Sequence, residues 1–153
     1  MQAAEISAPV ESVTADLLVL FHLEDEPAPR GRLGRVDWLL CGAVSRLRAR
    51  GKFRGERGGR ALLLAGPCLQ ADRVLIIGLG RRADCTLNHL YRVSYEAAQA
   101  VLDLGAGAIA LDIPARAFPH ESPERIRRAF LEGFLAELKR GRPEAALQVS
   151  VLA

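Results

Sequence analysis

The hydrophobic positions of this chain form short continuous runs, which alternate with longer segments of mixed character. Strands are predicted at residues 16–23, 60–65, 73–78, 108–113 and 146–152, and the continuous apolar run at residues 16–23 is typical of a strand buried on both faces. A short additional strand is expected at residues 5–8. Since strands alternate with helical patterns along the chain, the sequence predicts an α/β fold in which helices cover both faces of one sheet.

Three segments carry apolar residues at helical spacing. The first is predicted over residues 33–47, and Trp38 lies beside its apolar stripe, where a half-buried ring is expected. The second is predicted over residues 87–104, with Thr86 as its N-cap. The third begins after Ser122, and a proline occupies its first position, where the fixed φ of proline favours a helix.

Length and composition favour a single domain. The chain has 153 residues, of which 50% are hydrophobic and 25% are charged, as in ordinary globular proteins. One domain over residues 1–153 is therefore expected. No apolar run reaches the roughly 20 residues that cross a bilayer, and the first residues carry no secretory signal. A cytoplasmic protein without a membrane partner is the resulting prediction.

The residue types that catalysis or metal binding requires do not form a recognisable pattern. Cys41, Cys68 and Cys85 are widely spaced without a C-x-x-C pair, so buried, unreactive thiols are expected. His89 and His120 have no recognisable partner for acid–base work, and no Ser-His-Asp order is present. The sequence therefore predicts no catalytic residue, no metal site and no cofactor.

Positive charge is concentrated in residues 46–60, where Glu56 is the sole acid. The segment carries Arg46, Arg48, Arg50, Lys52, Arg54, Arg57 and Arg60. These side chains are candidates for nucleic-acid binding, which would be electrostatic and salt-sensitive. A solvated helix face followed by a loop is the other interpretation, because runs of charge usually face water. The opposite sign is concentrated at Glu24, Asp25 and Glu26.

A Gly-X-Gly follows the strand predicted at residues 73–78. Gly78, Gly80, Arg81 and Arg82 fit the loose form of a dinucleotide-binding loop and are candidate ligand-binding residues for a phosphate or a nucleotide. The following helix starts late, and only one such unit is present, which weakens this interpretation. Turn geometry at the glycines and solvated arginines at a loop tip remain the alternative.

Several of these segments together resemble a known family. The chain is similar to the N-terminal domain of the leucyl aminopeptidases, peptidase family M17, also called cytosol aminopeptidases. The resemblance covers most of the chain and rests on residues 16–21, 33–47, 51–58, 62–64 and 71–80. It implies a macro-domain-like fold, with three α/β/α layers around a mixed sheet.

The resemblance also implies what this domain does and does not do. The two-metal chemistry of the family resides in a separate C-terminal domain, and no residue here matches its metal-binding motif. We therefore expect an M17 N-terminal-like domain without the catalytic domain, acting in protein association or regulation, as a homo-oligomer or with a protein partner. In the family this domain helps to shape a hexamer and, in some bacterial members, contributes to DNA binding. The macro-domain-like fold also suggests ADP-ribose as a candidate ligand.

Overall fold

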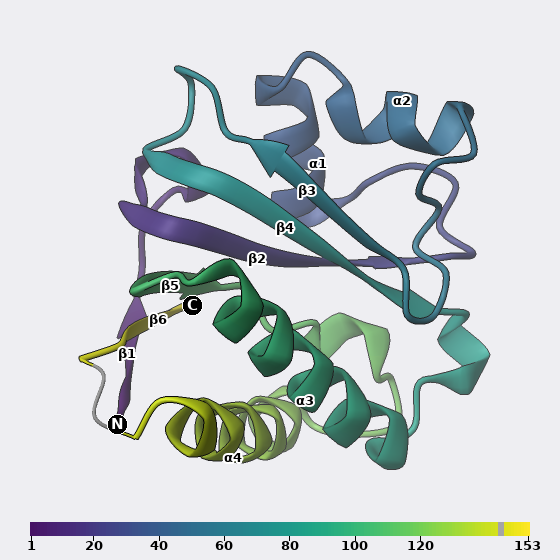
Figure 1. The fold of residues 1–153 in the computed structure, drawn as a ribbon. Coiled ribbons are helices and arrows are strands. Elements are labelled where there is room, and N and C mark those ends of the chain that lie inside the picture. Colours follow the sequence, from purple (N-terminus) through teal and green to yellow (C-terminus); the bar gives the residue numbers. More distant parts are fainter. Residues whose placement is uncertain (144–145) are drawn as a thin grey trace.

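The computed structural model describes residues 1–143 and 146–153, and it contains one sheet between two layers of helices (Figure 1). The sheet has six strands in the order β1-β6-β5-β2-β4-β3. Their bounds are β1 (Ala3–Ile6), β2 (Ala15–Leu23), β3 (Arg60–Leu64), β4 (Ala71–Gly80), β5 (Ala108–Leu111) and β6 (Gln148–Leu152). The predicted strands are therefore all present, and the short N-terminal strand begins two residues earlier than expected.

Five of the strands are parallel, and β3 alone is antiparallel. β2 pairs with β4 on one side and with β5 on the other, in parallel register. β3 pairs only with β4 and forms one edge of the sheet. The sheet is therefore mixed, as the family resemblance implied. The carboxyl ends of β2, β4 and β5 meet at one edge, which is where ligands bind in many open α/β sheets.

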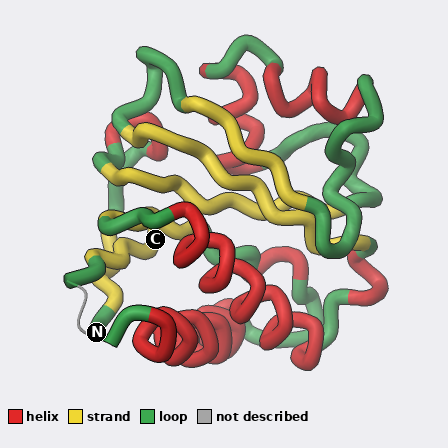
Figure 2. The backbone as a smooth tube through the Cα atoms, in the orientation of Figure 1, coloured by secondary structure: helices red, strands yellow, loops and turns green. Residues whose placement is uncertain are grey.

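The helices divide between the two faces of the sheet (Figure 2). One face is covered by α1 (Gly31–Leu39) and α2 (Ala43–Ala49), and the other by α3 (Leu87–Leu104) and α4 (Pro123–Gly141). Three short 3-10 helices lie in the connections: η1 (Val10–Ser12), η2 (Arg82–Asp84) and η3 (Ala115–Ala117). This arrangement confirms the three-layer α/β/α fold.

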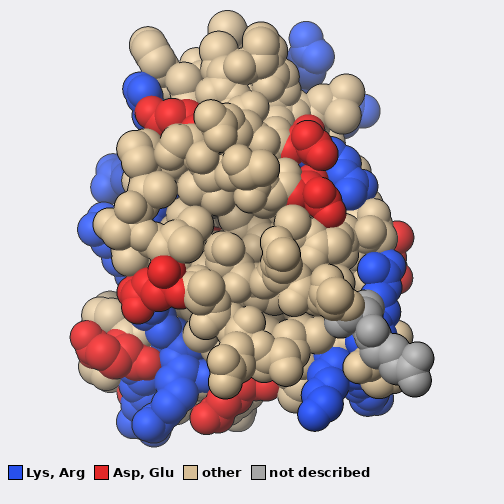
Figure 3. All heavy atoms as spheres, turned by 90° about the vertical axis from the view of Figure 1, so that its left-hand side faces the viewer, with Lys and Arg blue, Asp and Glu red and all other residues tan. Residues whose placement is uncertain are grey.

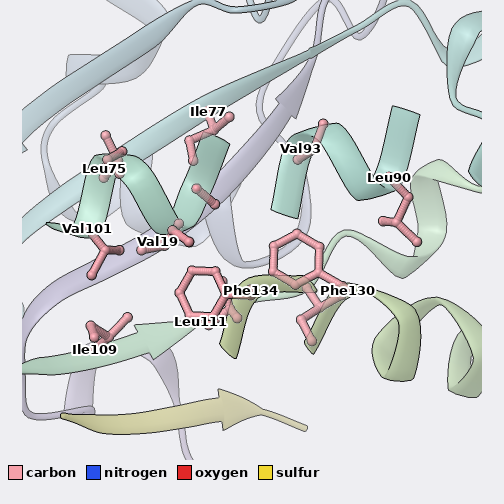
Figure 4. Close-up of a cluster of buried hydrophobic side chains, with 14 of the residues drawn as sticks. Val19, Leu75, Ile77, Leu90, Val93, Val101, Ile109, Leu111, Phe130 and Phe134 are labelled. Carbon is pink, nitrogen blue, oxygen red and sulfur yellow. The ribbon is translucent and has the colours of Figure 1, made fainter. Parts of the chain in front are cut away.

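Alternate residues of the central strands supply two separate cores. Leu17 and Val19 of β2 point toward α3 and α4, whereas Leu18 and Leu20 point toward α1 and α2. Figure 4 shows the first core, in which Phe130 and other side chains of α3 and α4 pack against the sheet. A strand buried on both faces needs apolar residues at every position, and this requirement explains the continuous runs in the sequence.

The helix predicted over residues 33–47 is in fact two helices. The chain turns at Cys41 and Gly42, whose φ angles are 54° and 78°. The buried Asp37 carboxylate accepts hydrogen bonds from the backbone N–H groups of Val44 and Ser45, at 2.8 and 3.1 Å. It thereby caps α2 from within α1, because the first N–H groups of a helix have no partner inside the helix. The apolar spacing alone did not reveal this break.

The expectation of a half-buried Trp38 was wrong. The side chain is 70% exposed and lies against Arg35, whose guanidinium carbon is 5.1 Å from the ring centroid.

The starts of α3 and α4 follow the prediction: Thr86 accepts from the His89 N–H, and Ser122 accepts from the Arg125 N–H. None of the helices in the described part of the chain is long and apolar enough to span a membrane.

Candidate functional site at the carboxyl edge of the sheet

Gly78 and Gly80 end β4 beneath a loop of the same chain. A Cβ atom at Gly78 would overlap the carbonyl oxygen of Glu56 and lie 2.7 Å from the carbonyl carbon of Gly55. Gly80 has a φ of +76° and donates its N–H to the Gly55 carbonyl at 2.9 Å. A Cβ at Gly80 would lie 3.2 Å from the Cβ of Arg57. Both glycines are therefore needed for close packing of the basic loop.

The loop itself is held over the ends of β2 and β4. Phe53 anchors it with a side chain that is 2% exposed. The Gly78 N–H donates to the Gly59 carbonyl at 2.8 Å, and the Glu56 carboxylate accepts from the Arg54 N–H at 2.7 Å. A phosphate approaching the two β4 glycines would have to displace this loop. Nucleotide binding at residues 78–82 stays a prediction.

The two arginines after β4 differ in their surroundings. Arg82 contacts the acidic segment: its N–H lies 3.2 Å from both carboxylate oxygens of Asp25, and its guanidinium is 3.1 Å from Glu26. It also donates to the Arg116 carbonyl at 2.8 Å, so it joins three loops at this edge. Arg81 is exposed, and within residues 1–143 and 146–153 no ion pair includes it. Of the two, Arg81 is the one whose charge is free for a ligand.

Asp112 lies at the end of β5 and is engaged by α1. Its carboxylate is 2.8 Å from the guanidinium of Arg32, which also donates to the carbonyl of Ala153. Burial raises the pKa of Asp112, and the neighbouring Arg32 opposes that shift. The ion pair thus joins the ends of β5 and β6 to α1.

The seven cations of residues 46–60 are spread over α2, the loop and the start of β3. All are exposed except Arg48, which is half-buried. Among the described residues, none of the seven forms a salt bridge. Their side chains are therefore not paired with a carboxylate in the described part of the chain, which is compatible with both a solvated surface and an anionic partner. Nucleic-acid binding by these residues stays a prediction.

Arg48 is held by backbone carbonyl groups. Its guanidinium donates to the carbonyls of Arg54 at 2.8 Å and Glu24 at 3.0 Å. A hollow of about 450 Å³ lies beside it and is lined by Pro27, Ser45, Arg48, Ala49 and Arg54. The sequence indicated the positive charge of this segment but not the hollow, because its walls come from three separate segments.

His22 lies behind Arg48, at the end of β2. It is 2% exposed, and its Nε2 atom is 3.5 Å from the Arg48 guanidinium. Burial lowers the pKa of His22, and Arg48 lowers it further, while Glu26 at 3.9 Å and Asp37 oppose the shift. Its Nδ1 atom is buried and has no hydrogen-bond partner among the residues that the structure describes. His22 is therefore a neutral packing residue near neutral pH.

The other candidate acid–base and metal-binding groups lie apart. His89 is buried, with its Nε2 atom 2.6 Å from the Leu79 carbonyl, and His120 is exposed. In the part of the chain that the structure describes, no three His, Cys, Asp or Glu residues are grouped so as to hold a metal ion.

The expectation of three buried thiols holds only for Cys85. Burial raises the pKa of the Cys85 thiol to about 11. Cys41 and Cys68 are exposed, and both line a hollow of about 670 Å³ with Trp38 and Leu39. Cys41 falls within the helix predicted over residues 33–47 but occupies the turn between α1 and α2.

Exposed apolar side chains gather on the edge strand β3. Leu64 is 82% exposed and Leu62 is 47% exposed. They share one face of the sheet, because Leu62 is paired with Leu75 and Leu64 with Arg73, two residues apart on β4. Helices α3 and α4 cover Leu75 but leave β3 uncovered. The apolar run in the sequence predicted a strand here but could not show that the strand lies at an edge of the sheet.

A second uncharged surface adjoins the start of the sheet. Figure 3 shows the side on which β2 and β4 begin, and charged side chains lie around its margin while its middle is uncharged. The connection between β3 and β4, which contains Cys68, lies on this side (Figure 1).

Comparison with known proteins identifies the fold and the family. Among solved structures, a tomato leucine aminopeptidase mutant superposes with a TM-score of 0.71 at 20% identity, over 99% of this chain and 32% of that one. A Trypanosoma brucei macrodomain gives a TM-score of 0.74 at 17% identity, over 97% of this chain and 60% of that one. These likenesses show the macro-domain-like fold.

Sequence relatives point to the same family. A "Probable cytosol aminopeptidase" of Geobacter sp. is 36% identical over 113 residues, which are 72% of this chain and 22% of that protein. One from Nitrosococcus oceani is 32% identical, over 74% of this chain and 22% of that protein. The chain thus spans about a fifth of the length of these relatives. The family model "Cytosol aminopeptidase family, N-terminal domain" matches residues 18–139. The chain belongs to the cytosol aminopeptidase family, and the part of the family that it matches is the N-terminal domain.

Proposed function

We propose that this chain is a non-catalytic accessory domain of the M17 type and that it acts through protein association. The observation that carries the proposal is the exposed edge of β3, where Leu62 and Leu64 form an apolar strip beside an unpaired row of backbone groups. Such an edge is a template for pairing with a strand of another chain. Burial of an exposed leucine stabilises a contact by about 1.5–3 kcal/mol when it is complete.

A second copy of the chain is the simplest partner for this edge. Two β3 strands that pair in antiparallel fashion about a twofold axis at Leu62 place the Leu64 of each copy beside the Arg60 of the other. No like charges then face each other, and the two apolar strips become continuous. The four leucines cover less area than a standard interface, so the association is expected to be weak and concentration-dependent.

The non-catalytic part of the proposal rests on the residues present. Residues 1–143 and 146–153 include no group of three metal-ligating side chains. The chain corresponds to about 22% of its relatives' length, and the family resemblance places the two-metal chemistry in another domain. A cytoplasmic location belongs to the same proposal.

Light scattering on the purified protein over a range of concentrations tests the association. We expect self-association that Leu62→Glu abolishes, because the twofold axis would place the two new carboxylates, which are like charges, opposite each other. Ala136→Glu, at an exposed position on α4, is the matched control and is expected to leave association unchanged. A wild-type protein that stays monomeric up to millimolar concentration would contradict pairing through β3.

An aminopeptidase assay tests the proposal that the chain is non-catalytic. We expect no hydrolysis of leucyl substrates by the pure protein with added Mn²⁺ or Zn²⁺. Turnover that a chelator abolishes would overturn the non-catalytic assignment.

Nucleic-acid binding by residues 46–60 and nucleotide or ADP-ribose binding at residues 78–82 remain alternative proposals. One solved structure of the Trypanosoma brucei macrodomain is a complex with ADP. The loop that covers Gly78 and Gly80 favours the accessory role over nucleotide binding at that position.

A further inference from the structure

We propose that the hollow between α2 and residues 51–59 is a binding site for a phosphate group, with Arg48 and Arg54 as its ligands. The site lies at the carboxyl edge of the sheet, and neither Leu62 nor Leu64 of the β3 strip lines it. It does not depend on the proposed association function.

Arg48 is oriented before any ligand arrives. Its two hydrogen bonds to the carbonyls of Arg54 and Glu24, at 2.8 and 3.0 Å, fix the guanidinium plane. A guanidinium has five N–H donors, so these bonds leave others for an oxyanion. Because the side chain is half-buried and already ordered, little further entropy is lost when a ligand binds.

The charged residues that line the hollow are both positive. None of the five lining residues is acidic. Three carboxylates of the surrounding segments bond other groups: Asp37 caps α2, Glu26 pairs with Arg82, and Glu56 accepts from the Arg54 N–H. Two cations from separate segments therefore line one hollow, and no carboxylate is among its described lining residues.

This combination selects the chemistry of the ligand. The planar fork of arginine matches the oxygens of a phosphate, to which it donates two parallel hydrogen bonds. A hollow of about 450 Å³ is larger than a phosphate group alone, so it also has room for part of the molecule that carries the phosphate. The phosphoryl group is the shared feature of inorganic phosphate, pyrophosphate and nucleoside phosphates.

Calorimetry with pyrophosphate, ADP and acetate, at ionic strength held constant with NaCl, tests the site. We expect saturable binding of pyrophosphate and no measurable binding of acetate. Arg54→Gln is expected to weaken pyrophosphate binding about tenfold, the equivalent of one charge-assisted hydrogen bond. Arg50→Gln removes the same charge from an exposed position that does not line the hollow, and it is expected to change the affinity less than twofold.

A spectroscopic measurement locates the ligand. The ring of His22 lies beside Arg48, so its NMR signals are expected to shift on saturation with pyrophosphate, while those of the exposed His120 remain in place. ADP that binds more tightly than pyrophosphate would identify a nucleoside phosphate as the source, and equal affinity would identify the bare phosphoryl group. Equal losses in Arg50→Gln and Arg54→Gln, or no pyrophosphate binding at millimolar concentration, would overturn the proposal.

Discussion

At the scale of single residues, the glycines of this chain explain a motif that looks functional in the sequence. Gly78 and Gly80 have the spacing of a phosphate-binding loop, but each faces the backbone or side chain of residues 55–57. Their lack of a side chain serves packing inside the protein. The packing of residues 55–57 therefore accounts for the Gly-X-Gly spacing, and a bound nucleotide is not needed to explain it.

Substitution of Gly78 tests this structural role. Gly78→Ala is expected to destabilise the protein by about 3 kcal/mol or more, because a methyl group must displace the backbone at Glu56. Gly58→Ala is the control, since its φ is +77° but no atom of the described residues lies within 4 Å of the new Cβ. It is expected to cost about 1–2 kcal/mol from backbone strain alone. Urea unfolding without any ligand measures the free energy of unfolding of both variants. A smaller loss of stability in Gly78→Ala than in Gly58→Ala would contradict the packing role.

At the scale of elements, one buried carboxylate decides how the first helical segment is divided. Asp37 belongs to α1, yet it accepts from the Val44 and Ser45 N–H groups and from the Ser45 hydroxyl at the start of α2. Gly42, in the left-handed region, lets the chain turn between the two helices. This turn directs α2 so that Arg48 faces the carboxyl edge of the sheet, where the candidate phosphate site lies.

Removal of this cap is expected to act on α2 more than on the rest of the fold. Asp37→Ala leaves buried N–H groups without partners and is expected to cost about 2–3 kcal/mol. Asp37→Asn keeps one acceptor oxygen and is expected to cost less. Hydrogen exchange can localise the effect, with faster exchange over residues 43–49 than over α3. Uniform loss of protection in both helices would count against a local capping role.

At the scale of the whole molecule, the carboxyl edge of the sheet brings a strand, a helix and a loop together around a buried histidine. His22 of β2 contacts Arg48 of α2, and its ring centroid is 6.3 Å from that of Phe53 in the loop. The charged groups that face it are Arg48, Glu26 and Asp37. Because the folded pKa of His22 lies below its ordinary 6.5, the unfolded chain takes up a proton first as the pH falls.

Folding stability should therefore decrease as the pH falls below about 6.5 and should be insensitive to His22 above it. The slope that one such group contributes is at most about 1.4 kcal/mol per pH unit. Chemical denaturation at several pH values between 5 and 8 measures it. We expect His22→Gln to flatten the profile and His120→Gln, at an exposed position, to leave it unchanged. A profile of identical slope in His22→Gln and the wild type would refute the assignment.

Much of the local structure could be predicted from the sequence because its causes are local. Continuous apolar runs marked β2 and β4, and Thr86 and Ser122 marked the starts of α3 and α4, since a strand buried on both faces and a capped helix each leave a signal within a few residues. The positive charge of residues 46–60 could also be read directly from the sequence.

The tertiary structure alone decided which of these features meet. It placed β3 at an edge, so that Leu64 is exposed although it belongs to an apolar strand. It brought residues 55–57 against Gly78 and Gly80, and Arg48 against the carbonyl of Glu24. Hydrophobic periodicity reports how many faces of an element are apolar but not which neighbour covers each face. Strand order and the contacts between distant loops determine which element packs on each face, and they thereby determine where the candidate sites lie.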